Sequence, residues 1–171
     1  NGTAHDFQKI ICSRRFNEIN WNLIPGKALS LLVNSNFITK HDLTDSYTEW
    51  LEKQPVAKFT GYVYELGKIF HESHGYLPLF KKHTLNKQFQ SLIEKAKENG
   101  KITSNVWCAL DTSGSMGIGT SAGVTALDIC TSLGVYFSTL NEGAFHKNVI
   151  MFDNTSRIKQ LSGDFCDMMS Q

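Results

Sequence analysis

Residues 106–115 read Val-Trp-Cys-Ala-Leu-Asp-Thr-Ser-Gly-Ser, an apolar run that ends on an acidic residue and a small polar loop. A continuous apolar run of this length is typical of a strand buried on both faces of a parallel sheet. A helical pattern follows over about residues 121–141, and a second apolar run covers residues 148–152. This order predicts a βαβ unit of an open α/β sheet, with residues 106–110 in the centre of the sheet.

Polar side chains follow the first of these predicted strands. In open α/β sheets functional groups gather outside the carboxyl ends of the strands, and the pattern places Asp111, Ser113 and Ser115 there. One carboxylate and two hydroxyls around one point suit Mg²⁺, Mn²⁺ or Ca²⁺, and they leave positions for water or for a partner's carboxylate. We therefore expect a metal site made of these three residues. The alternative is an ordinary polar turn that Asp111 caps.

The Asp-x-Ser-x-Ser sequence at residues 111–115 resembles the metal-ion-dependent adhesion site of von Willebrand factor type A domains. The resemblance covers about residues 102–171 and implies a Rossmann-like sheet that binds a protein partner supplying an acidic ligand. It also implies that the two serines contact the metal directly and that Asp111 often acts through water. The family completes its site with a threonine and an aspartate from later loops, for which this chain has no matching positions. We therefore expect a truncated domain with a weak metal site and a tendency to self-associate.

The first hundred residues are predicted to be helical throughout. Apolar residues recur at spacings of three and four in segments that begin near residues 7, 25, 42, 55 and 85, with Pro55 in the first turn of its helix. The composition then changes at residues 99–101, from Lys, Glu, Gln and aromatic residues to Gly, Ser, Thr and Val. The predicted fold is therefore α/β, with an all-helical region over residues 1–100 and a type A-like region over residues 101–171.

The helical region carries a second resemblance. Residues 19–25, Ile-Asn-Trp-Asn-Leu-Ile-Pro, followed by a helix with Tyr47 and Trp50, are similar to a poorly characterised family that joins helices to a C-terminal von Willebrand-type domain. The TROVE proteins, the Ro autoantigen group, share this plan and bind small RNAs through a ring of helices. This likeness implies RNA binding as an alternative function. The candidate RNA contacts are the basic doublets Arg14-Arg15 and Lys81-Lys82, although the net charge over residues 1–100 is only +3.

The remaining features of the sequence argue against several other classes. The chain has 17 Lys and Arg against 16 Asp and Glu, and it contains no apolar run long enough to span a membrane. Neither a signal peptide nor paired cysteines are evident, so we expect an intracellular, cytoplasmic protein with free thiols. The glycines at 117, 119 and 123 miss both the dinucleotide and the P-loop patterns, which argues against an enzyme. His71-x-x-His74 lacks a third ligand at zinc spacing.

Overall fold

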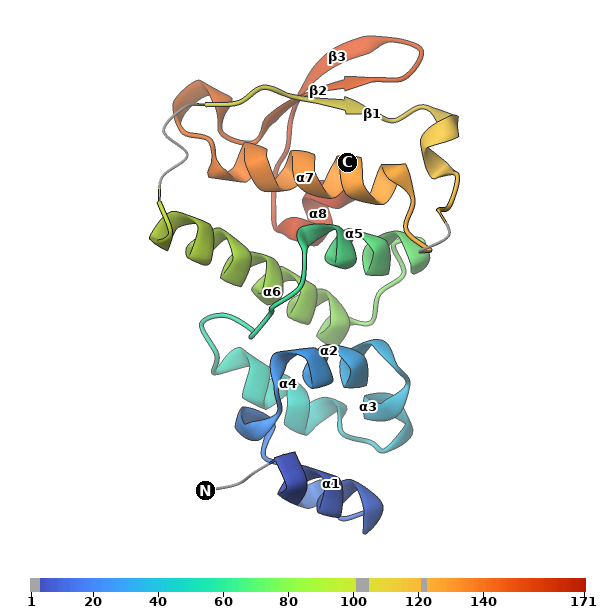
Figure 1. Cartoon of the computed structure of the whole chain (residues 1–171), viewed down its shortest axis with the longest axis vertical. Coiled ribbons are helices and arrows are strands. Elements are labelled where there is room, and N and C mark those ends of the chain that lie inside the picture. The colour runs from blue at the N-terminus through green and yellow to red at the C-terminus, as the bar shows by residue number, and fades with distance from the viewer. Residues whose placement is uncertain (1–3, 101–104, 121–122) are drawn as a thin grey trace.

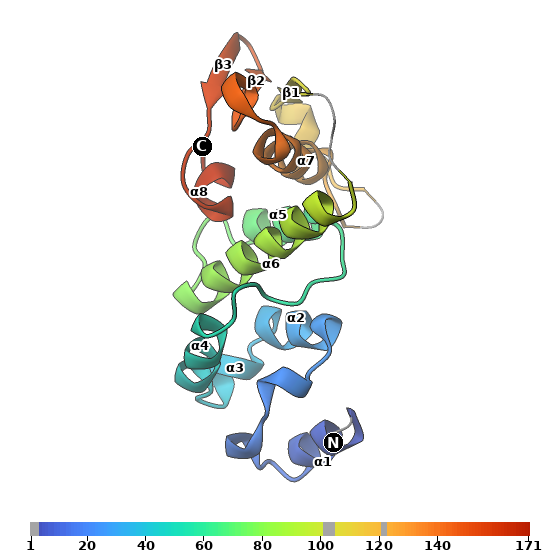
Figure 2. The ribbon, with the colours of Figure 1, turned by 90° about the vertical axis from the view of Figure 1, so that its left-hand side faces the viewer.

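The computed structural model describes residues 4–100, 105–120 and 123–171 of the chain. The fold is mixed α/β. Its helices are α1 (Ala4–Cys12), α2 (Gly26–Asn34), α3 (Phe37–Lys40), α4 (Thr44–Glu52), α5 (Val63–Glu72), α6 (Leu79–Glu98), α7 (Ala126–Leu140) and α8 (Phe165–Met169). Its strands are β1 (Cys108–Asp111), β2 (Asn148–Phe152) and β3 (Ser156–Gln160). The sheet lies at one end of the molecule, with α7 against it, α8, α5 and α6 next, and α1 to α4 at the other end (Figure 1, Figure 2).

The three strands form one sheet in the order β1-β2-β3. β1 and β2 are parallel, with Ala109 opposite Ile150, and α7 connects them. β3 returns antiparallel to β2, with Ile158 opposite Ile150. The parallel pair joined through a helix confirms the predicted βαβ unit.

The prediction of a central strand over residues 106–110 is wrong. Within the described residues β1 is an edge strand that begins at Cys108, and β2 is the central strand. Val106 and Trp107 precede β1 and are 42% and 45% exposed. The Asn141 side chain explains the late start, because it accepts the Val106 N–H at 2.9 Å and donates to the Val106 carbonyl at 2.7 Å. A side chain at the end of α7 thus takes the hydrogen bonds that a neighbouring strand would have made.

The helix expected to begin at Pro55 begins instead at Val63. The Glu65 carboxylate accepts the Tyr62 N–H at 3.1 Å, which fixes the first turn of α5 at this point. The residues before it form a connection of bends and irregular structure that is tied to α6, since the Ala57 N–H donates to the Lys87 carbonyl at 3.3 Å. Pro55 therefore lies in a connection between helices rather than in a first turn.

Two further helix starts differ from the prediction. α6 begins at Leu79, directly after Pro78, and not near residue 85. α7 begins at Ala126 rather than near residue 121, because the Thr125 hydroxyl accepts the Asp128 N–H at 2.9 Å and caps the helix there.

Buried apolar side chains form two clusters. One cluster gathers the helices α2 to α4, and its members are Trp21, Ile24, Leu29, Val33, Ile38, Leu43, Tyr47, Leu51, Ala57 and Phe80. The other joins α5 and α6 to the sheet and its helices, and it includes Phe59, Leu66, Leu85, Phe89, Leu110, Val135, Val149 and Phe165. The described residues before 101 contain helices and turns but no strand. The division between the two cores nevertheless falls near residue 58, and α6 contributes to both.

No helix within the described ranges combines the length and the apolar character needed to cross a membrane.

Candidate functional site

The candidate site is the loop that leaves β1. Asp111 is the last residue of β1 and lies opposite Phe152, the last residue of β2. The Thr112 N–H donates to the Phe152 carbonyl at 3.0 Å, so the sheet also fixes the first residue of the loop. A 3₁₀ turn follows over Gly114–Gly117, closed by the Met116 N–H on the Ser113 carbonyl at 3.0 Å. The carboxyl edge of the parallel pair therefore holds the start of this loop in one conformation.

Asp111, Ser113 and Ser115 come together in this loop. The Asp111 Oδ1 atom accepts the Ser113 N–H at 2.9 Å, and the Oγ atoms of Ser113 and Ser115 lie 3.2 Å apart. Asp111 and Ser113 are half-buried, whereas Ser115 is exposed. One carboxylate and two hydroxyls thus border the same open surface at the end of β1.

Hydrogen bonds from Ser113 favour the charged form of Asp111. The Ser113 hydroxyl, followed by the Ser113 amide, lowers the pKa of the Asp111 carboxyl below its ordinary value. Asp111 is therefore anionic throughout the neutral range, as a metal-binding carboxylate must be.

The donor set fits a hard divalent cation. Oxygens in neighbouring positions around an octahedral Mg²⁺, each about 2.1 Å from the ion, lie about 3 Å apart. The spacing of the two serine hydroxyls, 3.2 Å, matches such a neighbouring pair. Three protein oxygens fill half of an octahedral shell, so water or a partner's carboxylate would complete it.

Asp153, which follows β2, is engaged by residues close to it in the sequence. The Asp153 Oδ1 atom accepts the Thr155 N–H at 3.0 Å, and Oδ2 lies 3.6 Å from Arg157 Nη1. The Thr155 amide is the main cause that lowers the pKa of the Asp153 carboxyl. Among the described side chains no three or more His, Cys, Asp or Glu residues gather to hold a metal. The candidate site therefore depends on the serine hydroxyls.

A cavity of about 300 Å³ lies beside the loop and contains a pair that the sequence did not reveal. His71 Nδ1 lies 2.7 Å from Asp128 Oδ1, and the Asp128 side chain is 5% exposed. Asp128 Oδ2 accepts the Thr125 N–H at 2.7 Å. The same carboxylate therefore contacts His71 of α5 and holds Thr125, at the end of the loop, in place. His74 lies in the turn after α5 with φ 50°, and among the described residues neither histidine belongs to a group of three or more metal-ligating side chains.

The candidate RNA contacts lie on separate elements, with internal partners for three of them. Arg15 pairs with Glu18 at 3.0 Å, and Lys82 pairs with Asp167 at 2.7 Å. Lys81 Nζ donates to the Asn34 carbonyl at 3.2 Å. Arg14 follows α1, far along the molecule from α6, which carries the two lysines (Figure 1). The structure does not gather the two doublets into one basic surface.

In comparisons with protein-family models, with curated proteins and with solved structures, no match to this chain was found.

Proposed function

We propose that this chain is a divalent-cation-dependent protein-interaction module of the von Willebrand type A kind, with Asp111, Ser113 and Ser115 as the metal ligands. The observation that carries the proposal is the 3.2 Å spacing of the two serine hydroxyls beside an anionic Asp111. A bound Mg²⁺ or Mn²⁺ would supply a positive centre that attracts a carboxylate of a protein partner. The role of the chain's own residues is to orient three oxygens toward one point.

Binding is favoured over catalysis by the partners of the two hydroxyls. A serine nucleophile needs an adjacent general base, usually an imidazole. The hydroxyl of Ser113 is instead hydrogen-bonded to that of Ser115, and no imidazole among the described residues forms a hydrogen bond with either hydroxyl. This arrangement supports ligation of a cation and gives no support to attack on a substrate.

The test is a titration of the protein with Mg²⁺ and Mn²⁺, followed by NMR amide shifts. We expect saturable shifts confined to about residues 111–117, with a dissociation constant in roughly the millimolar range because protein oxygens fill only half of the shell. Asp111→Ala and Ser113→Ala should abolish these shifts. Asp153→Ala is the matched control, since it removes a carboxylate from the end of the neighbouring strand and should leave binding intact. Metal binding that survives Asp111→Ala would place the cation elsewhere and refute the proposal.

A second measurement tests whether the protein partner binds through a carboxylate. A peptide that contains glutamate should bind in the presence of Mg²⁺ and lose affinity when the glutamate is replaced by glutamine. Filter binding of RNA at several salt concentrations then separates this proposal from RNA binding by the helical region. A salt-dependent RNA affinity that the Arg14→Gln/Arg15→Gln variant loses would favour the RNA function instead.

A further inference from the structure

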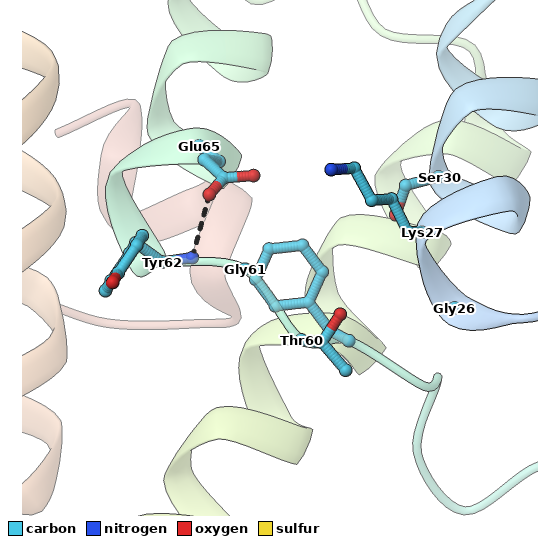
Figure 3. Close-up of a pocket in the computed structure, with 8 residues that line it drawn as sticks. Gly26, Lys27, Ser30, Thr60, Gly61, Tyr62 and Glu65 are labelled. Atoms are coloured by element: carbon cyan, nitrogen blue, oxygen red, sulfur yellow. Dashed lines mark hydrogen bonds between the residues drawn. The ribbon is translucent and has the colours of Figure 1, made fainter.

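A second cavity lies between α2 and the segment that leads into α5. Its volume is about 240 Å³, and it is lined by Gly26, Lys27, Ser30, Phe59, Thr60, Gly61, Tyr62 and Glu65 (Figure 3). Phe59 belongs to the core that contains the sheet, whereas Leu29 of α2 belongs to the core of the first helices. The cavity therefore lies at the junction of the two cores, a usual position for a ligand pocket.

Opposite charges face each other across this cavity. Lys27 extends from α2 and Glu65 from α5, and their charged ends point toward one another (Figure 3). Among the described residues no hydrogen bond or ion pair engages the Lys27 ammonium group. Glu65 uses Oε1 to accept the Tyr62 N–H at 3.1 Å and directs its second oxygen to the space beside Gly61. A ligand between the two side chains would meet a cation on one wall and an anion on the other.

The rest of the lining adds hydroxyl groups and aromatic surface. The Ser30 hydroxyl accepts a hydrogen bond from Gln88 Nε2 at 2.9 Å, which leaves its own proton for a ligand. Thr60 contributes a second hydroxyl at the edge. Phe59 is 5% exposed and Tyr62 is 69% exposed, so the cavity has a buried apolar side and an open aromatic rim.

Two of the residues that line the cavity are glycines. A Cβ atom at Gly61 would lie 2.7 Å from Glu65 Oε2, and a Cβ atom at Gly26 would lie 3.0 Å from the Lys58 carbonyl oxygen. A side chain at Gly61 would therefore press on the Glu65 carboxylate that lines the cavity. A side chain at Gly26 would instead meet Lys58, which lies outside the cavity lining.

We propose that this cavity binds a small zwitterion of the α-amino-acid class, independently of the metal loop. The ligand's carboxylate lies at Lys27, its ammonium group lies at Glu65, and its side chain packs on Phe59 and Tyr62. The cavity is smaller than the roughly 300–1,000 Å³ of pockets for drug-sized ligands, which favours a ligand of about ten non-hydrogen atoms.

The experiment uses the whole chain and follows the amides of Gly26 and Gly61 by NMR while each common L-amino acid is added in turn. The tightest-binding amino acid is then compared with its amide, which lacks the carboxylate, and with its N-acetyl derivative, which lacks the ammonium group. We expect the unmodified amino acid to bind roughly tenfold more tightly than either derivative.

Two variants test which side chain recognises the ligand's carboxylate and which recognises its ammonium group. Lys27→Gln should remove the preference over the amide, and Glu65→Gln should remove the preference over the N-acetyl derivative. Glutamine at position 65 still accepts the Tyr62 N–H, so the start of α5 is preserved. Lys40→Gln and Glu52→Gln, on exposed sites outside the cavity, are the matched controls and should change neither preference.

Three results would overturn the proposal. The first is the absence of shifts at Gly26 and Gly61 with every amino acid. The second is equal affinity for the amino acid and both derivatives, because charge would then not be recognised. The third is tighter binding of a dipeptide that begins with the same residue, since the ligand would then be a peptide end and not a free amino acid.

Discussion

His71 Nδ1 lies 2.7 Å from Asp128 Oδ1, so the last turn of α5 is joined to the first turn of α7. One helical turn away, Gly67 packs against Ser132. The two contacts show that the helices run in opposite directions, because the sequence number rises along α5 as it falls along α7. The positions also suit the helix dipoles, with an anionic Asp128 at a positive N-terminus and an imidazole at a negative C-terminus.

The charge of Asp128 should make stability depend on pH. Burial raises the pKa of this carboxyl, but hydrogen bonds from the Thr125 amide and from His71 outweigh it and lower the pKa below 3.8. A carboxyl whose pKa is lowered by folding adds stability above its unfolded pKa and loses it as the pH falls through the folded pKa. We expect Asp128→Asn to reduce the free energy of unfolding by about 2 kcal/mol near neutral pH. Urea unfolding should show this difference shrinking below pH 3.8, and a constant difference would contradict it.

The close approach of α5 and α7 should not tolerate a side chain at position 67. A Cβ atom at Gly67 would lie 1.8 Å from Ser132 Oγ, so Gly67→Ala forces the two helices apart. We expect a loss of about 1–3 kcal/mol in the free energy of unfolding. Adding Ser132→Ala should recover part of that loss. Gly114→Ala is the control, since a Cβ atom there meets nothing within 4 Å.

Tyr47 should be the last tyrosine to ionise. Burial raises its pKa to about 12, and its hydroxyl lies 2.8 Å from Thr84 Oγ1. A tyrosine whose pKa is raised by folding contributes stability that is fully present below pH 10.0 and lost as the pH rises toward 12. Unfolding measurements in alkaline buffers should therefore show a steeper loss of stability for the wild type than for Tyr47→Phe. Identical slopes would show that the hydroxyl is already accessible to water.

The outer face of the sheet should promote self-association. The described α-helices lie on one side of the sheet (Figure 2). Because Val149 is buried, the alternation along β2 directs Ile150 and Phe152 to the other side, together with Ile158 opposite Ile150. Ile158 is 68% exposed and Phe152 is 37% exposed. Light scattering after size exclusion, over a range of concentrations, should detect association that Ile158→Lys weakens. Leu31→Lys is the control, because Leu31 of α2 is 66% exposed away from the sheet. A wild-type mass that does not change with concentration would contradict the prediction.

The sequence was most informative where structure is local. Asp111, Ser113 and Ser115 lie within five consecutive residues at the end of a strand, so the local sequence was enough to predict that they lie close together. The His71–Asp128 pair joins residues 57 positions apart and depends on how α5 packs on α7. The Thr-x-x-Asp spacing of Thr125 and Asp128 is a capping pattern that could have indicated the role of Asp128 at the start of α7, but it was not used in the prediction.

The positions at which strands and helices begin depend on contacts between residues distant in the sequence, and a local sequence pattern does not reveal these contacts. The apolar run over residues 106–110 has the composition of a buried strand, but the Asn141 side chain holds Val106 outside the sheet. Pro55 suits a first helical turn, yet Lys87 of α6 donates to the carbonyls of Leu51 and Glu52 at 2.8 Å and 3.4 Å and ties the end of α4 to α6, so that Pro55 lies in a bend after that helix. In both cases a distant side chain overrides the local propensity.

Helix α6 makes the two halves of the molecule depend on each other for folding. Phe80, near its start, is buried with the first helices, whereas Leu85, Phe89 and Ile93 are buried with the sheet and its helices. A fragment cut after residue 100 would keep the whole of α6 but lose Val135, Val149 and Phe165, which belong to the core that buries the last three of these side chains. Neither half contains all the surfaces that this one helix must cover. The chain should therefore unfold in a single cooperative step, with α6 among the last elements to exchange its amide hydrogens with solvent.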